Sequence, residues 1–210
     1  MASNMKVLLV NGSPHEQGCT YTALSEVSIV LNKNGIETEI FHIGKGPFYG
    51  CNACHNCEKL GKCMYDKDPC NLLAEKAKGS DGFVFGSPVY FAGANGALCA
   101  ILDRAFYSQR EVFIGKPGAA VVSCRRGGAA SAFDRLNKYF AISQMPVVSS
   151  QYWNAVHGKT PAEVRKDAEG LQIMRTLGNQ MAYLLKRLAA AGNSVPPPTS
   201  EERIITNFIR

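Results

Sequence analysis

Five short apolar runs, each bounded by turn residues, recur along the chain and are separated by segments with a helical spacing of apolar residues. Because these runs are mostly apolar rather than alternating, they are typical of parallel strands buried on both faces. The intervening segments would then be helices that cover the two faces of one sheet. The five expected strands span residues 6–10, 37–42, 82–86, 118–123 and 147–152.

Strands that alternate with helices in this way predict a doubly wound α/β fold with a five-stranded parallel sheet, strand order 2-1-3-4-5 and helices on both faces. A ligand of such a sheet binds beyond the carboxyl ends of the strands. We expect one domain over residues 1–192, with a long insertion at 43–70 and a tail at 193–210. The insertion is far longer than usual, and loops of that length are usually functional or disordered.

Composition narrows the class of protein. The chain has 210 residues, 46% of them hydrophobic, which is enough for one real core. No stretch approaches the roughly 20 apolar residues of a membrane span, and no charged start followed by an apolar run marks a signal peptide, so we expect a cytoplasmic protein that does not bind membranes. The net charge of +6 arises in residues 111–210, where thirteen basic residues face seven acidic ones. These basic residues are scattered singly, which argues against nucleic-acid binding and leaves a solvated surface or a basic rim over a phosphorylated cofactor.

The loop after the first expected strand reads NGSPHEQGCT over residues 11–20. It matches neither the Walker pattern nor the dinucleotide glycine pattern, which argues against a nucleotide triphosphatase and a typical dinucleotide fold. Ser13 and Thr20 offer hydroxyls, and Gly18 lets the backbone approach a ligand at the start of a helix. Such a loop can hold a phosphate without a cationic side chain. The alternative is that Thr20 only caps the helix and Ser13-Pro14 is a turn.

Two further loops would meet at the same edge. The third strand leads into GSPVYFAGANG at residues 86–96, whose proline, aromatic rings and glycines would form a wall for a flat aromatic ring. The fourth leads into SCRRGG at residues 123–128, where arginine charge and a helix N-terminus would stabilise an anion. Gly127 and Gly128 would let the backbone approach closely. A solvated arginine pair is the alternative there.

Together, N-G-S-P-x(4)-G-x-T, G-S-P-V-Y-F-x(4)-G and the Leu102-Asp103-Arg104-Ala105-Phe106 segment resemble the NADPH-dependent FMN reductase branch of the flavodoxin-like superfamily. The resemblance covers nearly the whole chain and implies a flavodoxin-like fold with bound FMN. Cys19 departs from the pattern, because the family usually has asparagine there. The cofactor-binding residues that the resemblance implies are Ser13, His15, Gly18, Cys19, Thr20, Pro88, Val89, Tyr90, Phe91, Gly93, Ser123, Arg125, Arg126, Gly127 and Gly128.

The insertion carries Cys51, Cys54, Cys57 and Cys63 in the spacing C-x2-C-x2-C-x5-C. Three cysteines at successive three-residue steps resemble the start of a bacterial ferredoxin motif, but Met64 follows the fourth where a ferredoxin has proline. The arrangement is similar to that of the iron-sulfur flavoproteins of the same superfamily, which implies a four-iron cluster on these four thiols. Free thiols, a redox disulfide and zinc are the alternatives.

The resemblance implies an oxidoreductase that accepts hydride from NADH or NADPH onto FMN and passes electrons to a small-molecule or protein acceptor. No general acid stands out. The alternative function is an iron-sulfur flavoprotein that carries electrons and is fed by ferredoxin. We also expect a homodimer or homotetramer, with the apolar tail residues Ile204, Ile205, Phe208 and Ile209 packed on their own domain or on a partner subunit.

Overall fold

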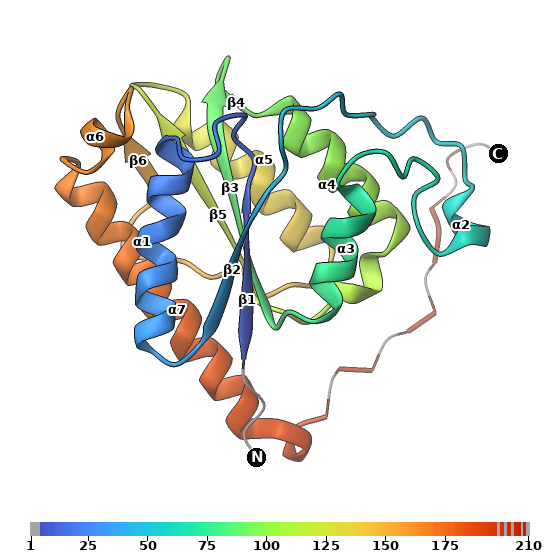
Figure 1. The fold of residues 1–210 in the computed structure, drawn as a ribbon. Helices are drawn as coiled ribbons and strands as arrows, with labels where there is room; N and C mark the ends of the chain where they lie inside the picture. Colours follow the sequence, from blue (N-terminus) through green and yellow to red (C-terminus); the bar gives the residue numbers. More distant parts are fainter. Residues whose placement is uncertain (1–4, 197, 200, 203, 207, 209–210) are drawn as a thin grey trace.

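A computed structural model of the chain describes residues 5–196, 198–199, 201–202, 204–206 and 208. Its parallel strands lie in the order β2-β1-β3-β5-β6, and a short β4 pairs antiparallel with β3 (Figure 1). Counted without β4, this is the predicted order 2-1-3-4-5, so the doubly wound topology is confirmed. The strands are β1 (Lys6–Asn11), β2 (Glu37–His42), β3 (Gly82–Tyr90), β4 (Gly93–Ala94), β5 (Gly118–Cys124) and β6 (Ala155–His157).

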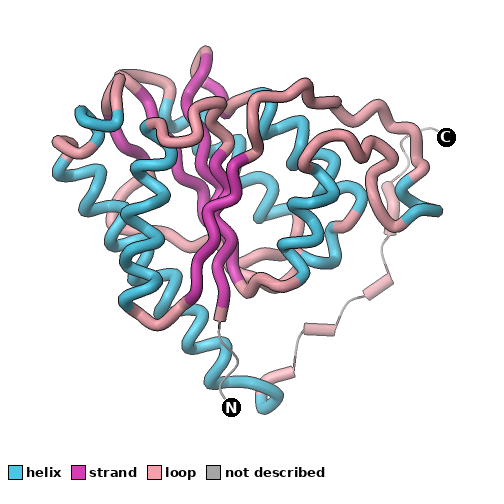
Figure 2. Tube along the Cα trace, in the orientation of Figure 1, coloured by secondary structure: helices cyan, strands magenta, loops and turns pink. Residues whose placement is uncertain are grey.

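Helices cover both faces of the sheet (Figures 1 and 2). On one face lie α1 (Cys19–Lys33) and the long α7 (Ala168–Ala191), and the other face is covered by α3 (Cys70–Lys78), α4 (Gly96–Ser108) and α5 (Ala129–Ile142). Short helices α2 and α6 lie in connecting segments. The remaining bounds are α2 (Cys57–Leu60), α6 (Pro161–Val164) and the 3-10 turns at Arg110–Val112 and Gly192–Ser194.

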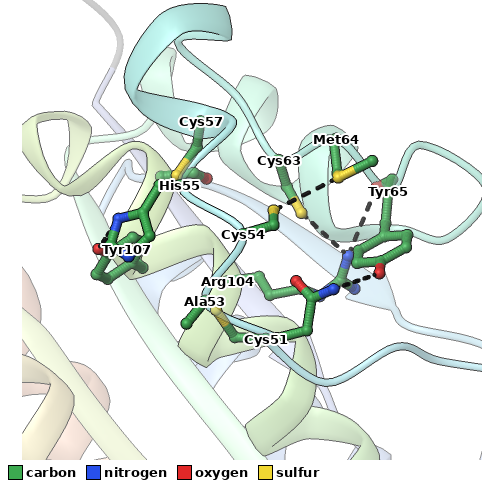
Figure 3. A pocket seen from close by; sticks show the side chains of 12 residues that line it. Cys51, Ala53, Cys54, His55, Cys57, Cys63, Met64, Tyr65, Arg104 and Tyr107 are labelled. Carbon is green, nitrogen blue, oxygen red and sulfur yellow. Dashed lines mark hydrogen bonds between the residues drawn. The ribbon is translucent and has the colours of Figure 1, made fainter.

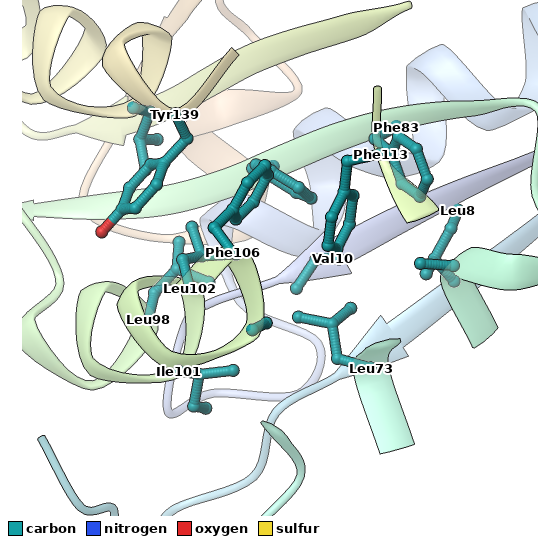
Figure 4. Close-up of a cluster of buried hydrophobic side chains, with 14 of the residues drawn as sticks. Leu8, Val10, Leu73, Phe83, Leu98, Ile101, Leu102, Phe106, Phe113 and Tyr139 are labelled. Carbon is teal, nitrogen blue, oxygen red and sulfur yellow. The ribbon is translucent and has the colours of Figure 1, made fainter. Parts of the chain in front are cut away.

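The central strands are buried on both faces, as their apolar sequences predict. Along β1, Leu8 and Val10 pack into the cluster under α3, α4 and α5, whereas Val7 and Leu9 pack under α1 and α7. The first cluster is rich in aromatic rings, of which Phe83, Phe106 and Phe113 are drawn in Figure 4. In it, the rings of Phe106 and Phe113 stack with centroids 4.2 Å apart.

The fifth strand is shorter and later than predicted. Residues 147–152 touch the sheet at one bridge, between Gly118 and Val147, and the Val148 amide donates to the Gly118 carbonyl at 2.8 Å. The Ser150 hydroxyl then donates to the Tyr152 carbonyl at 2.7 Å and turns the chain away. Pairing resumes at β6, three residues after the predicted end of the strand. The apolar Val147-Val148 pair therefore marks the approach to the edge strand rather than the strand.

The exposed tail contradicts one expectation. Ile204, Ile205 and Phe208 are 92%, 80% and 91% exposed, so their packing on their own domain is wrong. Packing on a partner subunit stays a prediction, as does the division into 1–192 and 193–210, while Ile209 lies outside the described residues. In the described part of the chain, no helix combines the length and the apolar character that crossing a membrane requires.

Gly86 in β3 lets α1 lie close to the sheet, which generates a testable prediction. A Cβ at Gly86 would lie 2.8 Å from Leu24 Cδ1 and 2.9 Å from Thr20 Cγ2. We expect Gly86→Ala to push α1 outward and to lower the free energy of unfolding by about 1–3 kcal/mol, measured by urea denaturation. Gly96→Ala is the matched control, because nothing lies within 4 Å of its added carbon. Equal stability of the two variants would contradict this tight fit.

Candidate functional site: a cavity at the strand edge and a cysteine loop

The loop after β1 is held in shape by Asn11, which is fully buried. Its Oδ1 accepts from the Ser13 amide at 3.1 Å, and its Nδ2 donates to the Glu16 carbonyl at 2.9 Å. The Ser13 hydroxyl oxygen in turn accepts from the His15 amide at 3.1 Å. The side chain of Asn11 thus fixes the curl of the loop before any ligand binds.

Asn95, the N-cap of α4, joins this loop to the one after β3. Its Nδ2 donates to the Gly12 carbonyl at 2.6 Å, its amide donates to the Ser87 hydroxyl oxygen at 2.8 Å, and its Oδ1 accepts from the Ala97 amide. Two segments that are distant in sequence, the loop after β1 and the stretch from the end of β3 to the start of α4, are therefore held together at the edge of the sheet. Neither Asn11 nor Asn95 was expected to position the site.

Thr20 does not cap α1, which settles one alternative. The N-cap is Gly18, and no side chain caps the helix there. Thr20 lies one residue inside the helix, and its hydroxyl shares a 2.8 Å hydrogen bond with the Ser123 hydroxyl from β5. Since the first-turn amides of a helix lack intrahelical acceptors, the start of α1 offers backbone donors to an anion.

One cavity of about 260 Å³ brings together residues at and just beyond the carboxyl ends of β1, β3, β5 and β6. Nine of the fifteen predicted cofactor residues line it, so residues far apart in sequence converge as expected. Its polar wall comes from the β1 and β5 loops and its apolar wall from the end of β3. The nine are Ser13, His15, Cys19, Thr20, Pro88, Val89, Tyr90, Ser123 and Arg125.

The other predicted residues lie around this cavity rather than in its wall. Gly18 lines an adjoining cavity with Lys45 and His42, while Arg126 and Gly128 line a different one beside Trp153. Phe91, another of the predicted residues, is fully exposed to solvent.

Three of the predicted glycines, Gly93, Gly127 and Gly128, differ in whether the surrounding chain leaves room for a side chain. Gly93 pairs with Tyr90 across the β3–β4 hairpin. Gly128 has φ +90°, and a Cβ there would lie 2.7 Å from Ala92 Cα, so the absence of a side chain lets its backbone lie against the β3–β4 hairpin. A Cβ at Gly127 would meet nothing within 4 Å, so crowding within the chain does not require this glycine.

Sequence reasoning missed Cys124, Gly158 and Lys159, which also line the cavity. Gly158 and Lys159 directly follow β6, so placing the fifth strand at residues 147–152 hid them. Lys159 also lines the adjoining cavity around the β1 loop. The loop therefore has a cation beside it, whereas the sequence predicted a phosphate site without one.

Two thiols lie in the cavity wall. Cys19 donates to the Gly158 carbonyl at 3.7 Å, and Cys124 donates to the Arg126 carbonyl at 3.7 Å. Burial raises the pKa of both thiols, so both stay protonated near neutral pH. Since the thiolate is the reactive form, these cysteines act as small polar wall residues and not as nucleophiles.

The cysteine loop forms a second site, drawn in Figure 3. Cys51, Cys54, Cys57 and Cys63 line one cavity together with side chains of α4. Positive φ angles at Ala53 and His55, 54° and 57°, turn the chain between the first three cysteines. The left-handed conformation costs a non-glycine residue about 1–2 kcal/mol, so other interactions of the loop must stabilise this turn.

The two halves of this loop differ in exposure. Cys51 and Cys54 are exposed, whereas Cys63 is buried beside α4. Cys70, a fifth cysteine near this loop, is fully buried at the start of α3, and burial raises the pKa of its thiol to about 12. His55, inside the cysteine motif, is exposed at the surface, with Nδ1 2.8 Å from Glu58 Oε1. Among the described residues, no group of three or more His, Cys, Asp or Glu side chains is arranged to hold a metal ion.

The described fold is that of a flavodoxin-like protein, and comparison with known proteins agrees. The chain resembles the structure of RosB with bound 8-demethyl-8-formylriboflavin-5'-phosphate, with a TM-score of 0.69, 16% identity, and coverage of 98% of this chain and 94% of the other. It also resembles a flavodoxin from the domain Archaea, with a TM-score of 0.60, 15% identity, and coverage of 87% and 99%. At these identities the likeness shows the fold alone.

Sequence comparison identifies the family. The sequence profile of the NADPH-dependent FMN reductase family matches residues 5–160, and the chain belongs to this family. It is therefore a flavoprotein oxidoreductase by family, as its motifs predicted. An iron-sulfur flavoprotein of Methanocaldococcus jannaschii is 32% identical over 194 residues, which cover 87% of this chain and 98% of that protein.

Lys159 provides a test of the cavity. FMN carries a phosphate dianion, and a cation beside the loop attracts it by about 1 kcal/mol in an exposed setting. We expect Lys159→Glu to raise the Kd for FMN roughly tenfold, measured by quenching of flavin fluorescence. Lys166→Glu is the control, since Lys166 is exposed and lies outside both cavities. Equal losses in the two variants would mean that only net charge matters.

Proposed function

We propose that this chain is an iron-sulfur flavoprotein that transfers electrons between FMN in the strand-edge cavity and a four-iron cluster in the cysteine loop. The observation that carries this proposal is the shared cavity of Cys51, Cys54, Cys57 and Cys63. Four thiols are the usual ligand set of such a cluster. The name of the Methanocaldococcus relative, which matches along nearly its whole length, supports the same function.

The strand-edge cavity fits FMN by the chemistry of its walls. The first-turn amides of α1, with Ser13 and Thr20, would hold the phosphate, and Pro88 and Tyr90 would flank the flavin ring. Arg125, at the mouth of the cavity, would favour negative charge on the ring. Bound FMN supplies transfer of electrons and hydride, so the protein contributes binding, orientation and electrostatics.

The cysteine loop fits a cluster by donor type, donor number and a shared cavity. The exposed Cys51 and Cys54 would move inward to reach ligating positions, whereas Cys63 is already held. A bound cluster supplies single-electron transfer. Zinc fits less well, because structural zinc sites usually pair two separated C-x2-C knuckles.

Iron content tests the cluster. Protein purified without oxygen should contain about four irons per chain and should show a broad visible absorption beside the flavin bands. We expect Cys63→Ser to lose most of this iron, whereas Cys99→Ser, at a half-buried cysteine of α4, keeps it. Background iron in the unaltered protein would overturn the cluster and leave free thiols or a disulfide.

Reduction of the flavin by NADH or NADPH is a second candidate function, which can operate with or without the cluster. It is favoured by the family and by the cations Arg125 and Lys159 at the open strand-edge cavity. These cations also suit the extra phosphate of NADPH. Under this proposal the electrons pass to a small-molecule or protein acceptor.

Stopped-flow absorption at the flavin band tests the donor. Mixed with NADPH under nitrogen, the FMN-loaded protein should lose its oxidised flavin absorption in a single binding-dependent phase. In a parallel experiment, reduced ferredoxin is mixed with the FMN-loaded protein in place of NADPH. Bleaching by ferredoxin with none by NADH or NADPH would contradict the nicotinamide donor and retain the electron-carrier function.

The proposed protein is cytoplasmic and forms a homo-oligomer. None of the eight cysteines, all of which lie in the described part of the chain, forms a disulfide, which suits a reducing cytoplasm. A homodimer or homotetramer is supported by the exposed apolar side chains of Ile204, Ile205 and Phe208, which a partner subunit could cover.

A further inference from the structure

Arg104, in the middle of α4, is a buried cation to which the proposed function assigns no role. It is 2% exposed and is among the largest fully buried side chains of the described residues. A guanidinium stays charged in proteins, and burying it is unfavourable unless its donors are paired. Its position therefore needs an explanation beyond packing.

The guanidinium points into the cysteine loop (Figure 3). Its Nη2 donates to Asp68 in an ion pair whose two side chains are each 1% exposed. Its Nη1 lies 3.4 Å from Cys63 Sγ and 3.5 Å from the Tyr65 carbonyl. One of the four cysteine sulfurs of the proposed cluster thus already accepts a hydrogen bond from a buried positive charge.

Asp68 connects the Arg104 guanidinium to the backbone at both ends of the cysteine loop. Its Oδ1 accepts from the Cys70 amide at 3.1 Å, and its Oδ2 accepts from the Tyr49 amide at 3.3 Å, so it joins the segments on either side of the four cysteines. Asn71 holds Cys63 from the other side, accepting from its amide at 3.0 Å and donating to its carbonyl at 2.9 Å. Cys63 is consequently fixed, while Cys51 and Cys54 are exposed.

We propose that Arg104 is a positioning residue of the cysteine loop that also raises the reduction potential of the cluster through its hydrogen bond to Cys63 Sγ. This inference rests on the proposed function. Reduction adds negative charge, and hydrogen-bond donors to ligand sulfur favour the more negative state. The effect is large where water is excluded, and Asp68 partly balances it because its carboxylate pairs with the same guanidinium.

The experiment measures the cluster potential by a redox titration of the full-length protein, loaded with FMN and iron, with the reduced cluster followed by electron paramagnetic resonance. Asp68→Asn leaves the arginine charge unbalanced and should shift the potential upward. The double variant Arg104→Met/Asp68→Leu removes both charges at similar volume and should shift it downward. Opposite signs are expected because Asp68→Asn adds one unit of positive charge beside Cys63, whereas the double variant leaves the net charge unchanged and removes the hydrogen-bond donor to Cys63 Sγ.

Arg135→Met is the matched control. Arg135 pairs with Asp103, the neighbour of Arg104 in sequence, at 2.9 Å, but this pair is about 40% exposed and is not part of the cysteine cavity. Its potential should equal that of the unaltered protein. A merely structural role of Arg104 predicts loss of iron in the variants with an unchanged potential in the clusters that remain.

An unchanged potential, or shifts of one sign in both variants, would overturn this inference while the iron content still supports the proposed function. If Asp68→Asn does not fold, the double variant decides by itself, since it buries no unpaired charge. Absence of iron from the unaltered protein would overturn the inference and the cluster together.

Discussion

The parallel register of β1, β3 and β5 is the constraint on which both the fold and the strand-edge cavity depend. This register aligns Asn11 with Gly86, and Pro88 with Ser123, so the three strands end at the same edge of the sheet. Residues separated by more than a hundred positions, such as Thr20 and Ser123, then come within hydrogen-bonding distance. The cavity follows from the sheet, because parallel strands deliver their loops to one side only.

Irregular loops at that edge carry backbone amides and carbonyls that must find partners. The side chains of Asn11 and Asn95 provide such partners for backbone groups of the loops. The loops therefore do not need to pair with each other through their backbones, which would fill the cavity. Because the side-chain oxygen and nitrogen of the buried Asn11 are both hydrogen-bonded, this asparagine also specifies one arrangement of the loop. The strand-edge cavity is thus formed before a ligand arrives, which lowers the entropy lost on binding.

Sequence reasoning succeeded where burial leaves a local pattern and failed where the outcome depends on distant partners. The topology and the convergence of Ser13, Pro88 and Ser123 follow from apolar runs and from the loops that come after them. The position of β6 does not, because this edge strand has only three residues and the Val147-Val148 pair mimics it. That error concealed Lys159, whose relevance comes only from its place after β6. The hairpin tip was equally hidden, since Phe91 and Ala92 adopt φ angles of 49° and 58° without the glycine or asparagine that usually announces such a turn.

Helix α4 links the two candidate sites. Its N-cap, Asn95, holds the loops of the strand-edge cavity, and Arg104 on the same helix holds the cysteine loop. Nine residues of helix separate them, which corresponds to about 14 Å. A packed helix transmits position but does not bend easily, so the separation of the two sites is set by the fold rather than by the long insertion. The insertion can consequently vary in shape around Cys51 and Cys54 while Cys63 keeps its place relative to the strand-edge cavity, and the proposed electron transfer would need such a fixed separation of its two centres.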